Sequence, residues 1–171
     1  VLPKVEADVT QLRQVVMNLV INAAQAIGER AGSVTVGTRL GRLDREWLAG
    51  AVHATELPEG DYVQLSVADT GCGMDEKTRG RIFDPFFTTK FTGRGLGLAA
   101  VLGIMRSHQG AVRVESREGH GTAFTVLLPP ARQARPNMPP EVPPVSTPLQ
   151  SQGEALVVDD EEIIRSALAL M

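Results

Sequence analysis

Two asparagines one helical turn apart, Asn18 and Asn22, are the first residues whose types and spacing could do chemistry. No charged side chain occurs between residues 14 and 28, where a solvated helix would carry several. The polar positions of this segment form one narrow helical stripe: Gln11, Gln14, Asn18, Asn22 and Gln25. Two interpretations remain open. The asparagines could bond to neighbouring backbone, or they could line a polar cleft where amide oxygens hold Mg²⁺ beside phosphates.

A carboxylate that we expect to be buried, Asp69, follows an alternating strand. It shares parity with Val63 and Val67, so it should point to the face that those residues bury. Gly71 and Gly73 come next and would let the backbone approach a ligand. The amino group of a purine would satisfy the carboxylate. A turn in which Asp69 caps local amides is the simpler alternative. An aspartic-protease site is rejected, because it needs a second copy of the motif and leaves the asparagine stripe unexplained.

A glycine-rich stretch, residues 93–98, opens a second helix. Free backbone N–H groups at a helix start suit phosphate, and Lys90 and Arg94 add positive charge beside them. No Gly-Lys-Ser/Thr follows, which excludes a Walker A loop. A polar loop rather than a strand precedes it, which excludes a dinucleotide fingerprint.

The elements that must position these residues follow from periodicity. We predict helices over residues 8–27 and 96–109, the second stopped by Gly110 as the left-handed residue after the helix. Strands are predicted over residues 33–40 and 62–68, followed by a hairpin formed by residues 111–117 and 122–128. Residues 41–60 are expected to be a charged surface excursion, with a short helix around Trp47 as one option.

Composition sets the broad class. The 171 residues suffice for one ordinary domain, and a net charge of −3 gives no electrostatic case for nucleic acid or an anionic membrane. The single cysteine, Cys72, and the absence of a long apolar run favour a cytoplasmic setting, although a membrane anchor could lie elsewhere in a longer parent protein. We expect three parts: a domain over residues 1–129, a proline-rich linker over 130–153, and a third segment over 154–171.

Taken together, the motifs resemble the histidine-kinase branch of the ATPase superfamily that also contains DNA gyrase, the ninety-kilodalton heat-shock chaperones and the MutL repair proteins. Residues 18–23 resemble the N box, 69–74 the G1 box, 83–90 the F box, 93–98 the G2 box, and 121–124 the late glycine-threonine motif. The resemblance implies an α/β (α+β) two-layer sandwich. A mixed β-sheet would be covered on one face by helices, and a flexible lid would close over ATP.

The resemblance also implies roles for individual residues. Asp69 would bond the adenine amino group with Thr122 nearby, Asn22 would coordinate Mg²⁺, and Asn18 would line the triphosphate pocket. The whole ATP-binding set is then Asn18, Asn22, Ala26, Asp69, Gly71, Gly73, Met74, Lys90, Gly93, Arg94, Gly95, Gly97, Leu98 and Thr122.

Asn18 indicates the kind of activity within this superfamily. Members that hydrolyse ATP carry a glutamate there to activate water, and the polar stripe of this chain contains no carboxylate. The resemblance therefore implies a protein histidine kinase rather than an ATPase that turns over as a conformational module. His53, His108 and His120 lack the context of a phosphoacceptor and are expected at the surface. The acceptor histidine would lie on an upstream dimerisation domain of the same protein.

The last segment, residues 154–171, resembles the first strand of a receiver domain. Asp159 and Asp160 would form part of its Mg²⁺ site, and the chain would then come from a hybrid kinase that relays phosphate to a receiver domain or response regulator. The alternative is that these carboxylates only favour the start of a following helix.

Overall fold

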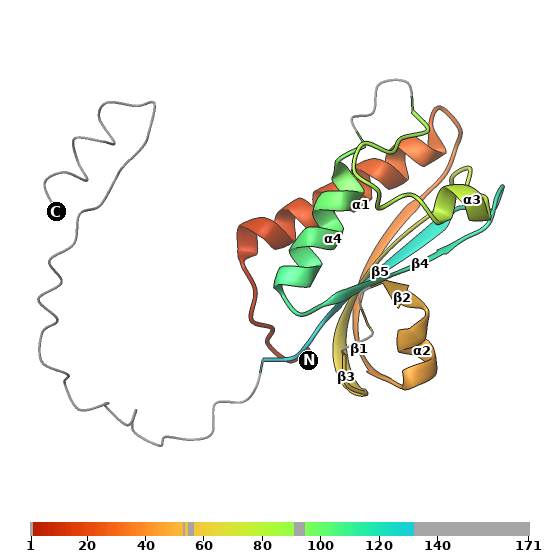
Figure 1. Cartoon of the computed structure of the whole chain (residues 1–171). Coiled ribbons are helices and arrows are strands. Elements are labelled where there is room, and N and C mark those ends of the chain that lie inside the picture. Colours follow the sequence, from red (N-terminus) through yellow and green to blue (C-terminus); the bar gives the residue numbers. More distant parts are fainter. Residues whose placement is uncertain (1, 53, 55–56, 91–94, 132–171) are drawn as a thin grey trace, which may run out of the picture. The chain divides into compact units, whose positions relative to one another are not determined.

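The computed structural model describes residues 2–52, 54, 57–90 and 95–131 (Figure 1). The chain divides into two compact units, Val1–Arg132 and Gln133–Met171. The predicted receiver segment and nearly all of the predicted linker lie outside the described residues, as do Asp159 and Asp160. The architecture below is that of the first unit.

Five strands form one antiparallel sheet in the order β1-β3-β5-β4-β2. The strands are β1 (Val34–Leu43), β2 (Ala51–Val52), β3 (Gly60–Asp69), β4 (Ala111–Ser116) and β5 (Thr122–Leu128). All four pairings are antiparallel, so the sheet is not mixed as predicted. The connections explain this: the chain runs from β3 through α4 to β4, but β5 lies between those two parallel strands, so they are not paired with each other.

Two helices cover one face of this sheet, α1 (Val9–Ile27) and α4 (Gly97–Ser107), side by side in Figure 1. Residues four apart on each helix, such as Val15 and Leu19, are fully buried against Val67 and Val126 of the sheet. The predicted two-layer sandwich is confirmed. Asp8 caps α1 by accepting from the amide of Gln11 at 2.9 Å.

The end of α4 corrects one prediction about glycine. The left-handed residue after the helix is Gln109, with φ 52°, and not Gly110. The amide of Gly110 donates to the Met105 carbonyl at 2.8 Å and that of Gln109 to Arg106 at 3.2 Å, which is the Schellman arrangement. Gly110 is instead required by packing, because a Cβ there would collide with the Leu127 carbonyl.

Residues 41–60 are more than a surface excursion. They carry α2 (Arg45–Ala49), which lies on the opposite side of the sheet from α1 and α4 (Figure 1). Leu48 is 1% exposed and packs with Tyr62 and Leu127, whose side chains point away from the main core. This second, smaller core covers one end of the other sheet face. No described helix is both long enough and apolar enough to cross a membrane.

The first and last described segments of the unit meet at one edge of the molecule (Figure 1). Val5 forms an antiparallel bridge with Pro130, and the amide of Ala131 donates to the Lys4 carbonyl at 2.8 Å. Close by, Nε2 of His108 accepts from the backbone amide of Asp8 at 3.0 Å. The imidazole therefore joins the end of α4 to the start of α1, a contact that periodicity does not predict.

Candidate functional site

A cavity of about 630 Å³ lies where α1, the ends of β3 and β5, the start of α4 and the loops around α3 (Glu76–Arg79) meet. Most of the predicted site residues line it: Asn18, Asn22, Ala26, Asp69, Gly73, Met74, Lys90, Gly95, Gly97, Leu98 and Thr122. The fold thus brings together segments that are far apart in the sequence. A cavity of this size is in the range of small-molecule sites.

The two asparagines have different partners. Nδ2 of Asn18 donates to the backbone carbonyl of Gly97 at 3.2 Å, which ties α1 to the start of α4. Oδ1 of Asn22 accepts from Nζ of Lys90 at 3.2 Å. Nδ2 of Asn18 is thus bonded to backbone and Oδ1 of Asn22 to a cationic side chain, and both residues also line the cavity.

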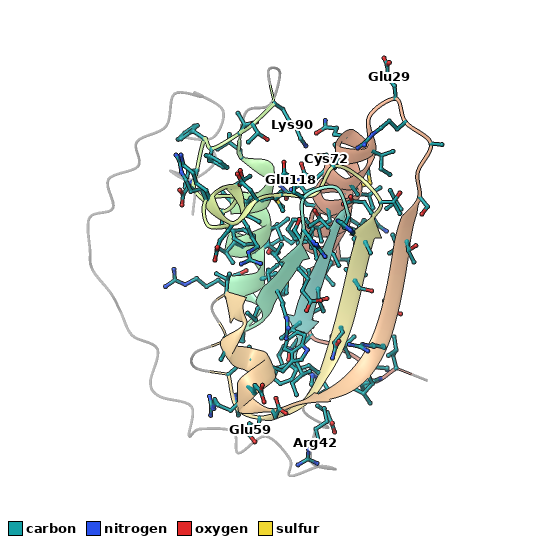
Figure 2. All side chains as sticks on the ribbon, turned by 90° about the vertical axis from the view of Figure 1, so that its right-hand side faces the viewer. Glu29, Arg42, Glu59, Cys72, Lys90 and Glu118 are labelled. Carbon is teal, nitrogen blue, oxygen red and sulfur yellow. The ribbon has the colours of Figure 1, made fainter. Side chains whose placement is uncertain are left out.

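Lys90 reaches back to α1 from the loop that follows α3. Its Nζ also donates to Oε1 of Gln25 at 2.7 Å. Burial lowers the pKa of the Lys90 ammonium from its ordinary value of 10.5, while the electrostatic influence of Cys72 and Asp69 acts in the opposite direction. Figure 2 shows Lys90 and Cys72 at the same end of the molecule, away from Arg42 and Glu59.

Asp69 is buried, with 8% of the residue exposed, as its strand parity predicts. Its Oδ1 accepts from the amide of Gly71 at 2.8 Å, so the turn interpretation is correct for one oxygen. A carboxylate can accept several bonds, which leaves capacity for a donor in the cavity. Thr122 lies directly opposite Asp69 in the β3–β5 register, and its hydroxyl contacts that of Ser116 at 2.9 Å. Asp69 is the single carboxylate among the described residues that line the cavity.

Gly71 and Gly73 are both required by packing within the protein, and Gly73 also lines the cavity. A Cβ on Gly71 would lie 2.6 Å from the carbonyl carbon of Ala26, and Gly71 does not line the cavity. Gly73 has φ 66°, and a Cβ there would collide with the backbone of Arg117. Cys72, between them, donates from its amide to the Ala26 carbonyl at 3.0 Å. The loop is therefore held between α1 and the β4–β5 hairpin.

The start of α4 is open to an anion. Within the described part of the chain no side chain caps the helix at Leu96, its first turn carries no acidic residue, and Gly97 and Leu98 line the cavity. Unpaired N–H groups and the helix dipole at such an end favour negative charge. Gly95 has φ 66° and accepts from the amide of Phe86 at 3.0 Å. Gly93 and Arg94 of the predicted phosphate loop lie outside the described residues.

Several lining residues were missed by the sequence prediction of the site. They are Ile21, Gln25, Cys72, Thr78, Ile82, Phe87, Thr88, Thr89 and Phe124. Gln25 belongs to the polar stripe and Cys72 to the glycine-flanked motif, so those two carried a usable signal. The position of Thr78 depends on the path of the chain after Met74, which no periodic pattern fixes.

Metal binding by protein groups alone is not supported in the described part of the chain, where no cluster of three His, Cys, Asp or Glu side chains could hold an ion. The amide oxygen of Asn22 faces the Lys90 ammonium, so it is already oriented toward a positive charge. A Mg²⁺ ion at this oxygen would need further oxygens from a bound phosphate and from water.

Residues 7–132 match the family described as histidine kinase-, DNA gyrase B-, and HSP90-like ATPase. The sensor kinase CckA of Brucella abortus is 37% identical over 94% of this chain and 18% of its own length. The sensor histidine kinase ZraS of Escherichia coli K12 is 39% identical over 75% of this chain and 23% of its own. The chain thus spans about a fifth of the length of these relatives.

Two solved structures share the fold, the first of them from a histidine kinase. The catalytic domain of ThkA has a TM-score of 0.55 at 34% identity, covering 74% of this chain and 70% of that one. Full-length ShkA, solved in complex with AMPPNP, has a TM-score of 0.57 at 34% identity, covering 75% of this chain and 23% of that one.

Proposed function

The chain belongs to the family of histidine kinase-, DNA gyrase B-, and HSP90-like ATPases, and from this premise we propose that it is the ATP-binding catalytic domain of a sensor histidine kinase. The observation that carries the proposal is the single cavity shared by Asn22, Asp69 and the uncapped start of α4. These three features supply what a nucleotide needs: an oxygen for a cation, an acceptor for a base and a site for phosphate.

In the proposed complex, the free acceptor capacity of Asp69 receives the adenine amino group, with Thr122 beside the ring. The phosphates lie toward Lys90 and the N-terminus of α4, and Gly93 and Arg94, which lie outside the described residues, are further proposed ATP-binding residues. The ShkA structure contains AMPPNP, an ATP analogue, which supports an adenine nucleotide as the ligand class.

We propose that Asn22 holds Mg²⁺ together with the ATP phosphates. When bound, the ion neutralises charge on the transferring phosphoryl group. The chain's own residues do the remaining work, since Lys90 adds a second positive charge and Asn18 fixes the start of α4 through Gly97. Phosphoryl transfer requires mainly this positioning and charge stabilisation.

The proposed acceptor of the γ-phosphoryl group is a histidine on the protein's own upstream dimerisation domain. Hydrolysis needs a base close to an attacking water, and the described cavity lining contains no carboxylate except Asp69, which the proposed complex places at the adenine rather than at the phosphates. From the acceptor histidine, phosphate would pass to a receiver aspartate. That receiver is either a response regulator or a domain whose first strand includes Asp159 and Asp160. ATP is abundant in the cytoplasm, where we expect the reaction to take place.

Calorimetric titration of the 171-residue chain with AMPPNP and Mg²⁺ tests this function. Asp69→Asn should weaken binding by roughly tenfold to a hundredfold, because an amide NH₂ would face the adenine donor. Asp61→Asn, on an exposed residue at the far end of β3, is the matched control and should bind like the parent. A folded parent chain that fails to bind AMPPNP, with folding checked by circular dichroism, would refute the proposal.

A further inference from the structure

The Lys90 side chain is held by two amide oxygens of α1, and the proposed function uses only one of them. Nζ of Lys90 lies 2.7 Å from Oε1 of Gln25 and 3.2 Å from Oδ1 of Asn22. Residues three apart on a helix share a face, so both oxygens can point to one ammonium group. The shorter contact is to Gln25, which makes Gln25 the main anchor of this arrangement.

Both hydrogen-bond acceptors of the Lys90 ammonium are neutral amide oxygens, and no carboxylate forms an ion pair with it among the described residues. Lys90 is absent from the ion pairs of the described residues, which involve arginines only. Two neutral amides can fix the direction of a partly buried ammonium through charge-assisted hydrogen bonds. They do not neutralise it, so the ammonium keeps its attraction for any anion that enters the cavity. The contact can therefore be exchanged when phosphate arrives.

The same oxygen of Asn22 cannot serve two cations. On the proposed function, on which this inference rests, Oδ1 of Asn22 binds Mg²⁺, and in the structure it accepts from Nζ of Lys90. Two positive charges on one amide oxygen would repel one another strongly in a cavity of reduced dielectric constant. The arrangement in which Lys90 contacts both Gln25 and Asn22 and the one in which Mg²⁺ binds Asn22 are therefore mutually exclusive.

We propose that Gln25 is a positioning residue that keeps Lys90 on Asn22, so that binding of Mg²⁺ and nucleotide exchanges the lysine for the metal. Gln25 then stabilises only the arrangement that excludes Mg²⁺. Its removal should tighten nucleotide binding, which is the opposite of what a residue in contact with the nucleotide would do. This sign distinguishes the two roles.

The test measures the Kd of AMPPNP by calorimetry over a series of Mg²⁺ concentrations, for the parent chain and for Gln25→Met. Methionine keeps the length and helix preference of glutamine and removes the acceptor. The loss of one hydrogen bond to a charged group should lower the Kd up to roughly tenfold and lower the Mg²⁺ concentration at half-saturation. Gln25→Ala should shift both in the same direction.

Repeating the Gln25→Met measurement in a chain that already carries Lys90→Met tests whether Gln25 acts through Lys90. In that background Gln25→Met should leave the Kd and the Mg²⁺ midpoint unchanged, because the group that Gln25 positions is gone. Gln14→Met, on an exposed residue of α1 outside the cavity lining, is the matched control and should behave like the parent.

An unchanged or raised Kd in Gln25→Met would overturn the inference while leaving the proposed function in place. The same holds if Gln25→Met tightens binding equally in the Lys90→Met background. Failure of the folded parent chain to bind AMPPNP would refute the proposed function and this inference with it.

Discussion

The turn that carries Gly121 into β5 allows a stability prediction to be worked out from geometry. Gly121 has φ 85°, and a Cβ there would collide with the backbone carbonyl of Asp69. Alanine in left-handed backbone costs about 1–2 kcal/mol. Forcing a methyl group into a packed contact costs typically another 1–3 kcal/mol. Gly121→Ala should therefore lower the free energy of unfolding by about 2–5 kcal/mol, a large part of the roughly 5–15 kcal/mol of an ordinary domain.

Gly119→Ala, in the same turn, separates these two contributions. Gly119 also has positive φ, 77°, but a Cβ there would meet nothing within 4 Å. Only the cost of alanine in left-handed backbone remains, so Gly119→Ala should lower the free energy of unfolding by about 1–2 kcal/mol. Urea unfolding followed by the fluorescence of Trp47, the one tryptophan, measures both variants. Equal midpoints for the two variants would refute the close contact between the turn and the end of β3.

Three further substitutions test other parts of the fold by urea unfolding. Leu48→Ala should lower the free energy of unfolding by about 2–5 kcal/mol, because Leu48 is part of the second core. A decrease below about 1 kcal/mol would contradict that assignment. Gly103→Ala should stabilise the chain by about 0.5–1 kcal/mol, because this exposed helical position has nothing within 4 Å of an added Cβ. His108→Ala should cost about 1 kcal/mol through the lost bond to Asp8, with faster hydrogen exchange at that amide, and unchanged exchange would argue against the contact.

Helices and core strands of this domain could be predicted from the sequence because their signals are local. The start of α1 follows from Asp8 as a capping residue, and the burial of Asp69 follows from its parity with Val63 and Val67. The site could be predicted only as a set of motifs. Which of them share one cavity depends on the strand order, which places Asp69 opposite Thr122.

Other features depended on contacts between distant segments and could not be predicted from local patterns. Gly71 and Gly73 carry the same sequence signal as a ligand-binding glycine, yet their neighbours are Ala26 and Arg117. The role of α2 was missed because its apolar side chains are few and fill a second, small core. Likewise, the hydrogen-bond partners of Asn18 and Asn22 depend on where α4 and Lys90 lie in the fold.

The bridge between Val5 and Pro130 has a mechanical consequence. Because the two ends of the domain run antiparallel and adjacent, a force that pulls them apart acts along the direction of their hydrogen bonds and opens the bridge first. A backbone hydrogen bond such as the one from Ala131 to Lys4 contributes only about 1 kcal/mol net. The ends can therefore separate under modest tension while the sheet and the cavity stay folded.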